Sequence, residues 1–223
     1  MYFADQVISR PDRHCVGVAT SKTVTGPYAP ASTPFTCHLA QGGAIDPDGF
    51  QDVDGTRYVT YKVDGNSKGH GGDCLNTVPP IAPTPLMLQQ VASDGMTLIG
   101  EPIEILDRDA LDGPLIEAPS LHRTSQGIYF LFFSSNCFTG PLYDSNYATA
   151  SNITGPYTRS QVPLFITGDG PDLRGPGGLD IVKDGTRVVF HSHMNNSFGY
   201  VGYTPRAMYT ANLTFSGHTV SAS

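Results

Sequence analysis

The sequence has 223 residues, of which 39% are hydrophobic and 15% charged, and a formal net charge of −7 at neutral pH. This composition excludes a disordered chain or a coiled coil and allows one sizeable core. The 13 lysines and arginines form no cluster, so we expect no nucleic-acid partner, because phosphate binding needs a basic surface. No apolar run reaches the length of a membrane span, so we expect no membrane partner either.

The chain opens on an apolar strand, predicted at residues 1–6, with a further strand at 16–21. No turn or inner strand stands before the first of these, so we expect the first repeat to be incomplete at its N-terminal side. The opening residues also lack the charged and then apolar pattern of a signal peptide.

Two pairs of segments recur at nearly the same offset. ATSKTVTGPY at 19–28 matches ATASNITGPY at 148–157, an offset of 129 residues. DGTRYV at 54–59 matches DGTRVV at 184–189, an offset of 130 residues. Two independent matches indicate internal repetition.

Each repeat contains an apolar strand followed by a third strand. The apolar strands are 1–6, 58–63, 129–135 and 188–193, and the third strands are 16–21, 86–91, 146–151 and 207–212. Turns at Asp54-Gly55, Gln126-Gly127 and Asp184-Gly185 precede the last three apolar strands, and Asp-Gly is a strong hairpin signal. About sixty residues per unit is typical of a β-propeller blade. We therefore predict one all-β propeller domain over residues 1–223, with about four blades visible, in preference to a generic all-β sandwich.

Three segments stand just before the predicted turns, at 42–50, 114–121 and 174–182. In a propeller they would surround one axial funnel and bring Asp46 and Glu117, 71 residues apart, to equivalent positions of neighbouring blades. Two carboxyl groups across a funnel are typical of a glycoside hydrolase. The apolar neighbours of Glu117 favour a proton donor. The alternatives are a turn-forming aspartate and a salt-bridged structural glutamate.

The strings GGAIDP, LIEAPSL, YFLFFSSN and ATASNITGPY resemble glycoside hydrolase family 43, and most of all its secreted fungal, arabinanase-like members. The resemblance covers nearly the whole chain. It implies a five-bladed propeller that cleaves arabinose- and xylose-containing plant polysaccharides by single displacement with inversion. By motif, Glu117 matches the family's general acid, and Asp46 matches the aspartate that modulates the pKa of that acid.

The chain departs from this family pattern in two places. The segment with the family's base aspartate is not matched, because residues 1–28 resemble the second half of the second blade and neither Asp5 nor Asp12 fits. Impaired hydrolysis, or carbohydrate binding without catalysis, is therefore the alternative function. Gly178 stands where many members have a histidine beside a central metal or water cluster. His191 or His193 could point inward instead and bind substrate, although a lone strand histidine is more often a core residue. We expect no metal and no cofactor.

Four cysteines allow three disulfide pairings. All four lie near the funnel face of the predicted strand map, and we predict Cys15–Cys37 and Cys74–Cys137. The even cysteine count, together with glycosylation sequons at Asn152, Asn195 and Asn212, favours a secreted protein.

The glycine-rich loop 64–74 lacks the residue order of a phosphate-binding loop. We expect it at the rim of the funnel, where it would shape sugar subsites together with Asn136 and Phe138.

Overall fold

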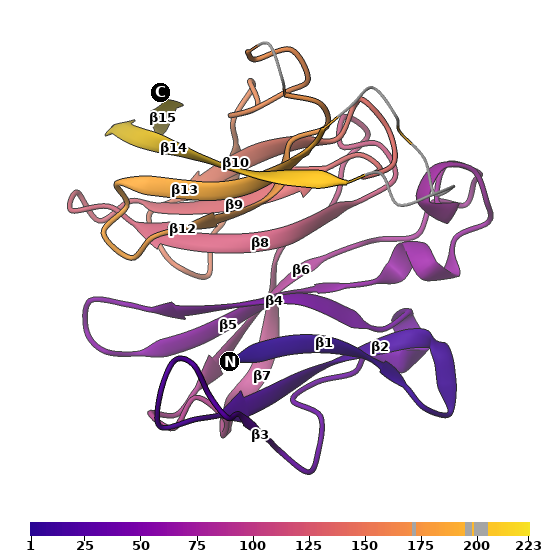
Figure 1. Cartoon of the computed structure of the whole chain (residues 1–223), viewed down its shortest axis with the longest axis vertical. Coiled ribbons are helices and arrows are strands. Elements are labelled where there is room, and N and C mark those ends of the chain that lie inside the picture. Colours follow the sequence, from indigo (N-terminus) through magenta and orange to yellow (C-terminus); the bar gives the residue numbers. More distant parts are fainter. Residues whose placement is uncertain (171–172, 195–197, 199–204) are drawn as a thin grey trace.

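The computed structural model describes residues 1–170, 173–194, 198 and 205–223. Within them the strands form four antiparallel sheets in chain order (Figure 1). The first sheet has three strands: β1 (Tyr2–Val7), β2 (Arg10–Thr20) and β3 (Ala29–Pro30). The second has four: β4 (Ala44–Gln51), β5 (Arg57–Val63), β6 (Leu86–Val91) and β7 (Leu98–Leu106).

The third and fourth sheets repeat the four-stranded plan. The third contains β8 (Ile116–Arg123), β9 (Tyr129–Ser135), β10 (Asp144–Ala150) and β11 (Thr158–Arg159). The fourth contains β12 (Gly177–Ile181), β13 (Arg187–His193), β14 (Arg206–Ser216) and β15 (Thr219–Ala222). Short 3-10 helices occupy loops: η1 (Leu39–Gln41), η2 (Gly65–Lys68) and η3 (Asp73–Leu75). No helix in the described part of the chain is long and apolar enough to span a membrane.

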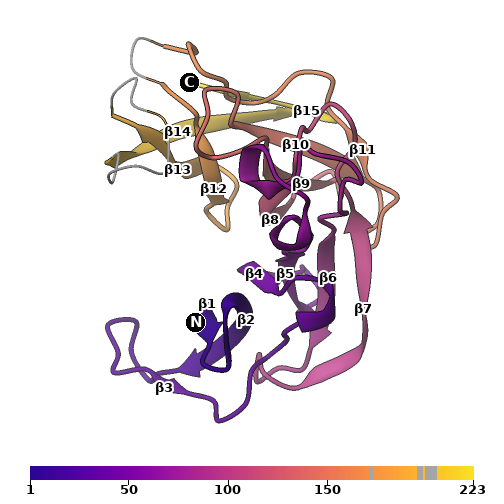
Figure 2. The ribbon, with the colours of Figure 1, turned by 90° about the vertical axis from the view of Figure 1, so that its right-hand side faces the viewer.

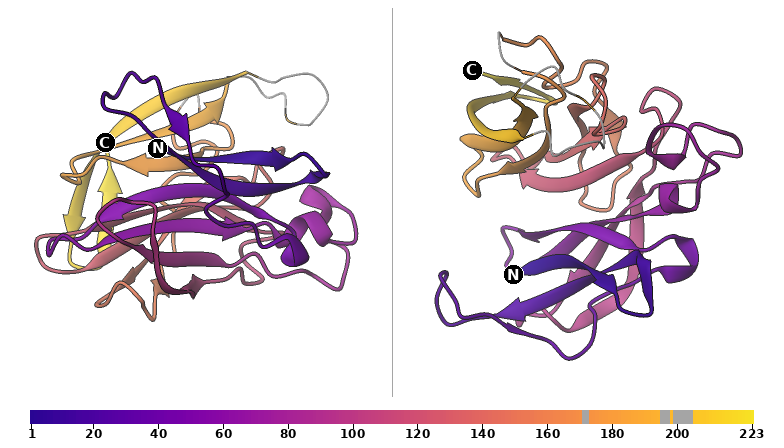
Figure 3. Two further views of the ribbon diagram at one scale, coloured as in Figure 1. Left: turned by 90° about the horizontal axis from the view of Figure 1, so that it is seen from below. Right: turned by 45° about the vertical axis from the view of Figure 1, so that its right-hand side comes forward.

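The four sheets follow one another in an arc, as a propeller requires. Figure 2 shows β4, β8 and β12 toward the inside of this arc and β7 and β11 toward the outside. The first and last sheets lie at its two ends (Figure 3). The apolar strands predicted from the sequence are β1, β5, β9 and β13, and the predicted third strands are β2, β6, β10 and β14.

The core is divided into layers between neighbouring sheets, and this explains the unbroken apolar runs in the sequence. In β9, Phe130 and Phe132 pack toward the fourth sheet, whereas Leu131 and Phe133 pack toward the second. Alternate side chains of a strand point to opposite faces, so a strand between two buried layers needs apolar residues at successive positions. The same alternation in β5 sends Val59, Tyr61 and Val63 toward the first sheet and leaves Lys62 facing the third.

Candidate active site

The inner strand of each four-stranded sheet carries the same irregularity. Its pairing shifts between Ile45 and Asp48 in β4, between Glu117 and Ser120 in β8, and between Gly177 and Asp180 in β12. The residue after the first member of each pair has a positive φ, at 53° for Asp46, 52° for Ala118 and 62° for Gly178. A β-bulge of this kind re-aims side chains beside functional sites.

These registers correct one prediction. Asp46 and Glu117 are not equivalent positions, because Glu117 pairs with Ser134 as Ile45 pairs with Lys62, and the counterpart of Asp46 is Ala118. The positive φ in each strand marks the true alignment, which is one residue away from the offset read in the sequence. The two acids still converge, since Asp46 Oδ2 accepts a hydrogen bond of 3.0 Å from the backbone N–H of Ala118.

The three bulged segments surround one small pocket on the propeller axis. It has a volume of about 250 Å³ and is lined by residues 46–48, 118–120 and 178–180. The three segments 42–50, 114–121 and 174–182 therefore do meet around a common axis.

Hydrogen-bond donors hold both carboxylate oxygens of Glu117. The Tyr143 hydroxyl donates to Oε1 at 2.7 Å, and Lys62 Nζ donates to Oε2 at 3.1 Å. The same ammonium group lies 3.1 Å from Asp64 Oδ1, and the Lys62 side chain is only 1% exposed. Glu117 thus directly precedes the residues that line the axial pocket and belongs to a buried ion pair, so the structural alternative noted for it describes its contacts correctly.

The electrostatics of this cluster follow from burial and from three carboxyl groups around one cation. Burial, and then the charge of Glu117, raises the pKa of Asp46 to about 6, against the opposing effect of Lys62. Burial acts to lower the pKa of Lys62, but Glu117 and Asp64 outweigh it and raise that pKa to about 12. Burial and the Glu117 charge also raise the pKa of Tyr143 well above its usual range, so the phenol remains a donor.

The two histidines predicted to bind substrate, His191 and His193, lie close to this cluster. The ring of His191 stacks on Tyr143, with centroids 6.1 Å apart, and its Nε2 lies 3.2 Å from Arg206 Nη1. Burial and then the Arg206 charge lower the pKa of His191 to about 4, which keeps the ring neutral. The buried His193 places Nε2 2.9 Å from the backbone oxygen of Phe138.

Glycines in β12 make room for this stack. A Cβ atom at Gly178 would lie 2.8 Å from the His191 ring, and a Cβ atom at Gly177 would lie 2.0 Å from Tyr143. The His191 ring therefore lies directly beside the position where Gly178 replaces the expected histidine. The donor set for a metal is poor, because the described residues contain no group of three or more histidine, cysteine or acidic side chains that could hold one.

The predicted disulfides are both present, and they leave no free cysteine. Cys15–Cys37 fastens the first sheet to the segment before β4, and Cys74–Cys137 joins the loop 64–74 to the loop after β9. That second link places Asn136 and Phe138 next to the glycine-rich loop. The sequons at Asn152 and Asn212 are exposed, whereas the sequon at Asn195 lies outside the described residues.

Asn136 and Phe138 occupy different environments. Asn136 has a φ of 67°, and its backbone N–H donates to Asp112 O at 2.8 Å. The Arg206 guanidinium lies 5.7 Å from the centre of the Phe138 ring. Whether either side chain contacts sugar stays a prediction.

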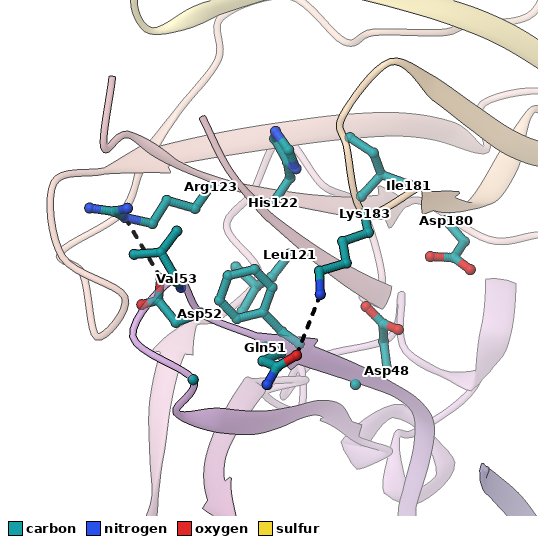
Figure 4. A pocket seen from close by; sticks show the side chains of 13 residues that line it. Asp48, Gln51, Asp52, Val53, Leu121, His122, Arg123, Asp180, Ile181 and Lys183 are labelled. Carbon is teal, nitrogen blue, oxygen red and sulfur yellow. Dashed lines mark hydrogen bonds and ion pairs between the residues drawn. The ribbon is translucent and has the colours of Figure 1, made fainter. Parts of the chain in front are cut away.

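A larger pocket of about 600 Å³ lies on the side of Asp48 and Asp180 that faces the Asp54-Gly55 turn. Figure 4 shows Asp48 and Asp180 close together at one end of this pocket. Lys183 donates a hydrogen bond to Gln51, and Arg123 forms an ion pair with Asp52. Neither Glu117 nor Asp46 lines this pocket. Of the two acids, Asp46 lines the axial pocket, and Glu117 directly precedes its lining residue Ala118.

We expect Asp48 to make the stability of the fold depend on pH. Burial, followed by the nearby Asp180 charge, raises its pKa to about 7, whereas an unfolded aspartate titrates near pH ~4. Between these two pH values the folded state therefore binds more protons than the unfolded state does. The contribution of Asp48 to the stability of the fold falls as the pH rises through this window. We expect Asp48→Asn to raise the melting temperature at pH 8 by roughly 3–8 °C, and much less at pH 4. Thermal unfolding at both pH values measures this.

The exposed Glu101→Gln variant is the control for that measurement. A melting temperature of Asp48→Asn that tracks the parent protein at pH 8 would contradict the expectation.

The chain is similar to known proteins both in sequence and in structure. The sequence model described as "Glycosyl hydrolases family 43" matches residues 1–215. The crystal structure of a thermostable family-43 glycoside hydrolase aligns with a TM-score of 0.78 at 23% identity, over 100% of this chain and 70% of that chain. An endo-1,4-beta-xylanase from Bacteroides thetaiotaomicron gives 0.72 at 24% identity, over 100% and 70%.

An arabinanase from Bacillus subtilis gives a TM-score of 0.66 at 22% identity, over 93% of this chain and 67% of that chain. No sequence of a curated protein matches the chain. The structural alignments confirm the predicted propeller fold.

Proposed function

Because the chain belongs to glycosyl hydrolase family 43, we propose that it hydrolyses arabinose- or xylose-containing plant polysaccharides or the oligosaccharides derived from them. Glu117 is the general acid and Asp46 modulates its proton affinity, within one propeller domain over residues 1–223. The observation that carries this proposal is the hydrogen bond from Ala118 N–H to Asp46 Oδ2, which fastens the second acid beside the first at the propeller axis. The similar xylanase and arabinanase support the substrate class.

The reaction is a single displacement with inversion. Glu117 gives its proton to the glycosidic oxygen while a base carboxylate activates a water molecule on the opposite face of the sugar. Within residues 1–223 no residue matches the family's base aspartate, so the proposal assigns only the acid and its modulator.

The direct test is the release of sugar from linear arabinan, arabinoxylan and nitrophenyl α-arabinofuranoside and β-xyloside. We expect turnover of at least one of these substrates, and proton NMR of the first-formed product should show the inverted anomer. Retention of configuration would contradict the mechanism, and the absence of turnover on every substrate would contradict the assignment as a hydrolase.

A second function is carbohydrate binding with impaired or no hydrolysis, which the unmatched base aspartate favours. Titration calorimetry with arabinan oligosaccharides would then show binding while no reducing ends appear. Both functions fit a secreted protein, because disulfides persist in oxidising compartments and both disulfides of this chain are formed.

A further inference from the structure

A buried cation, Lys62, lies among the acids of the site. Lys62 reaches this place because β5 alternates: its odd-numbered neighbours Tyr61 and Val63 pack against the first sheet, so position 62 faces β8. A lysine in such a strand is costly to bury unless it is paired. Here Nζ lies 3.1 Å from both Glu117 Oε2 and Asp64 Oδ1.

The contacts to Glu117 favour one protonation state. Both oxygens face donors, Lys62 at Oε2 and Tyr143 at Oε1. Hydrogen bonds donated to a carboxylate stabilise its ionised form. Two hydrogen-bond donors are therefore already in place beside the carboxylate that would remain after Glu117 gives up a proton.

We infer that Lys62 and Tyr143 are positioning residues that stabilise the carboxylate left when Glu117 protonates the glycosidic oxygen. This inference rests on the proposed function. The proton passes from Glu117 to that oxygen, the bond from the oxygen to the anomeric carbon breaks, and its electron pair stays on the oxygen. The oxygen of the attacking water bonds to the anomeric carbon in the same displacement, and the base carboxylate takes the proton of that water. The negative charge that develops on Glu117 is met by an ammonium group and a phenol already in place, with no reorganisation at the moment of reaction.

The other charged and titratable groups set the balance. Asp46 and Asp64 oppose ionisation of Glu117, and Lys62 favours it. Tyr143 connects outward to His191, whose ring is stacked on it, and His191 contacts Arg206. Because Lys62 is shared with Asp64, the strength of the acid depends on how the ammonium charge is divided between Asp64 and Glu117.

Lys62→Met tests this directly, because methionine keeps an unbranched side chain that is only one atom shorter and removes its charge. We expect the alkaline limb of the kcat/KM profile to move up by about one pH unit. Arabinan hydrolysis should fall by about 10–100-fold. Hydrolysis of the nitrophenyl glycoside should fall by less than about 3-fold, because nitrophenolate leaves with little help from an acid. Tyr143→Phe should act in the same direction with a smaller effect.

Asp64→Asn gives the opposite sign, since it removes one negative charge and leaves more of the Lys62 charge to Glu117. Its alkaline limb should move to lower pH. The matched control is Lys183→Met, because Lys183 is an exposed lysine that lines the larger pocket. If no Lys62 variant folds, Tyr143→Phe and Asp64→Asn decide the question.

A second readout does not need turnover. Carbon-13 NMR of labelled glutamate carboxyls, with the Glu117 signal identified by its loss in Glu117→Gln, should show this carboxyl titrating at higher pH in Lys62→Met than in the parent protein. If the parent protein hydrolyses nothing, the proposed function falls while this titration still tests the inference. A folded Lys62→Met protein with an unmoved Glu117 titration overturns it.

Discussion

Glu117→Gln should lower kcat/KM on arabinan by about 10²–10⁴-fold, the range that one positioned proton donor contributes. Glutamine keeps the shape of the side chain and an oxygen that can accept from Tyr143, but it has no proton to give. The loss should be much smaller on a nitrophenyl glycoside, whose leaving group departs without protonation. Steady-state kinetics on both substrates measure the two ratios, and their difference separates lost acid catalysis from lost substrate binding.

Folding must be checked in the same variant, because Glu117 is half of a buried ion pair. Lys62 keeps Asp64 as a partner when Glu117 is neutralised, so we expect a smaller loss than the roughly 3–5 kcal/mol of a fully broken buried pair. Thermal unfolding shows whether the variant is native at the assay temperature. Full arabinan activity in a native Glu117→Gln protein would remove Glu117 from the mechanism.

The fold could be predicted from the sequence because a propeller blade leaves local signals. Strands such as β9 are buried on both faces and read as continuous apolar runs, and Asp-Gly or Gln-Gly turns separate them from the inner strands. The disulfide pairing followed from the same strand map, since Cys74 and Cys137 come after corresponding strands of neighbouring sheets.

The site was only partly predictable. Motifs in the sequence single out Asp46 and Glu117 as candidates, but the sequence puts their alignment one residue out, because a bulge changes the pairing without changing the hydrophobic pattern. Tyr143 gave no signal, since it lies between strands, and its contact with Glu117 depends on how β8 and β12 approach. The sequence did contain a signal for Lys62, because a lysine within the apolar run YVTYKV needs a buried partner for its charge.

Asp46→Asn should weaken the acid's hold on its proton and shift the alkaline limb of the pH profile to lower pH by about one unit. The reason is Coulombic: a negative charge beside Glu117 makes it harder to ionise, and asparagine removes that charge. The same coupling acts in the other direction, since the Glu117 charge contributes to raising the pKa of Asp46 to about 6. The side-chain oxygen of asparagine can still accept from Ala118 N–H, so the bulge should survive.

The rate should fall together with this shift. At neutral pH fewer molecules of the variant carry a protonated Glu117, and for a shift of about one pH unit kcat/KM on arabinan should drop by up to about 10-fold, with recovery as the assay pH is lowered. Asp54→Asn, at an exposed carboxylate in the turn between β4 and β5, should leave the profile in place. An alkaline limb that does not move would contradict this role of Asp46, because asparagine keeps the hydrogen bond to Ala118 and removes only the charge. The negative charge of Asp46 would then have no part in tuning the acid.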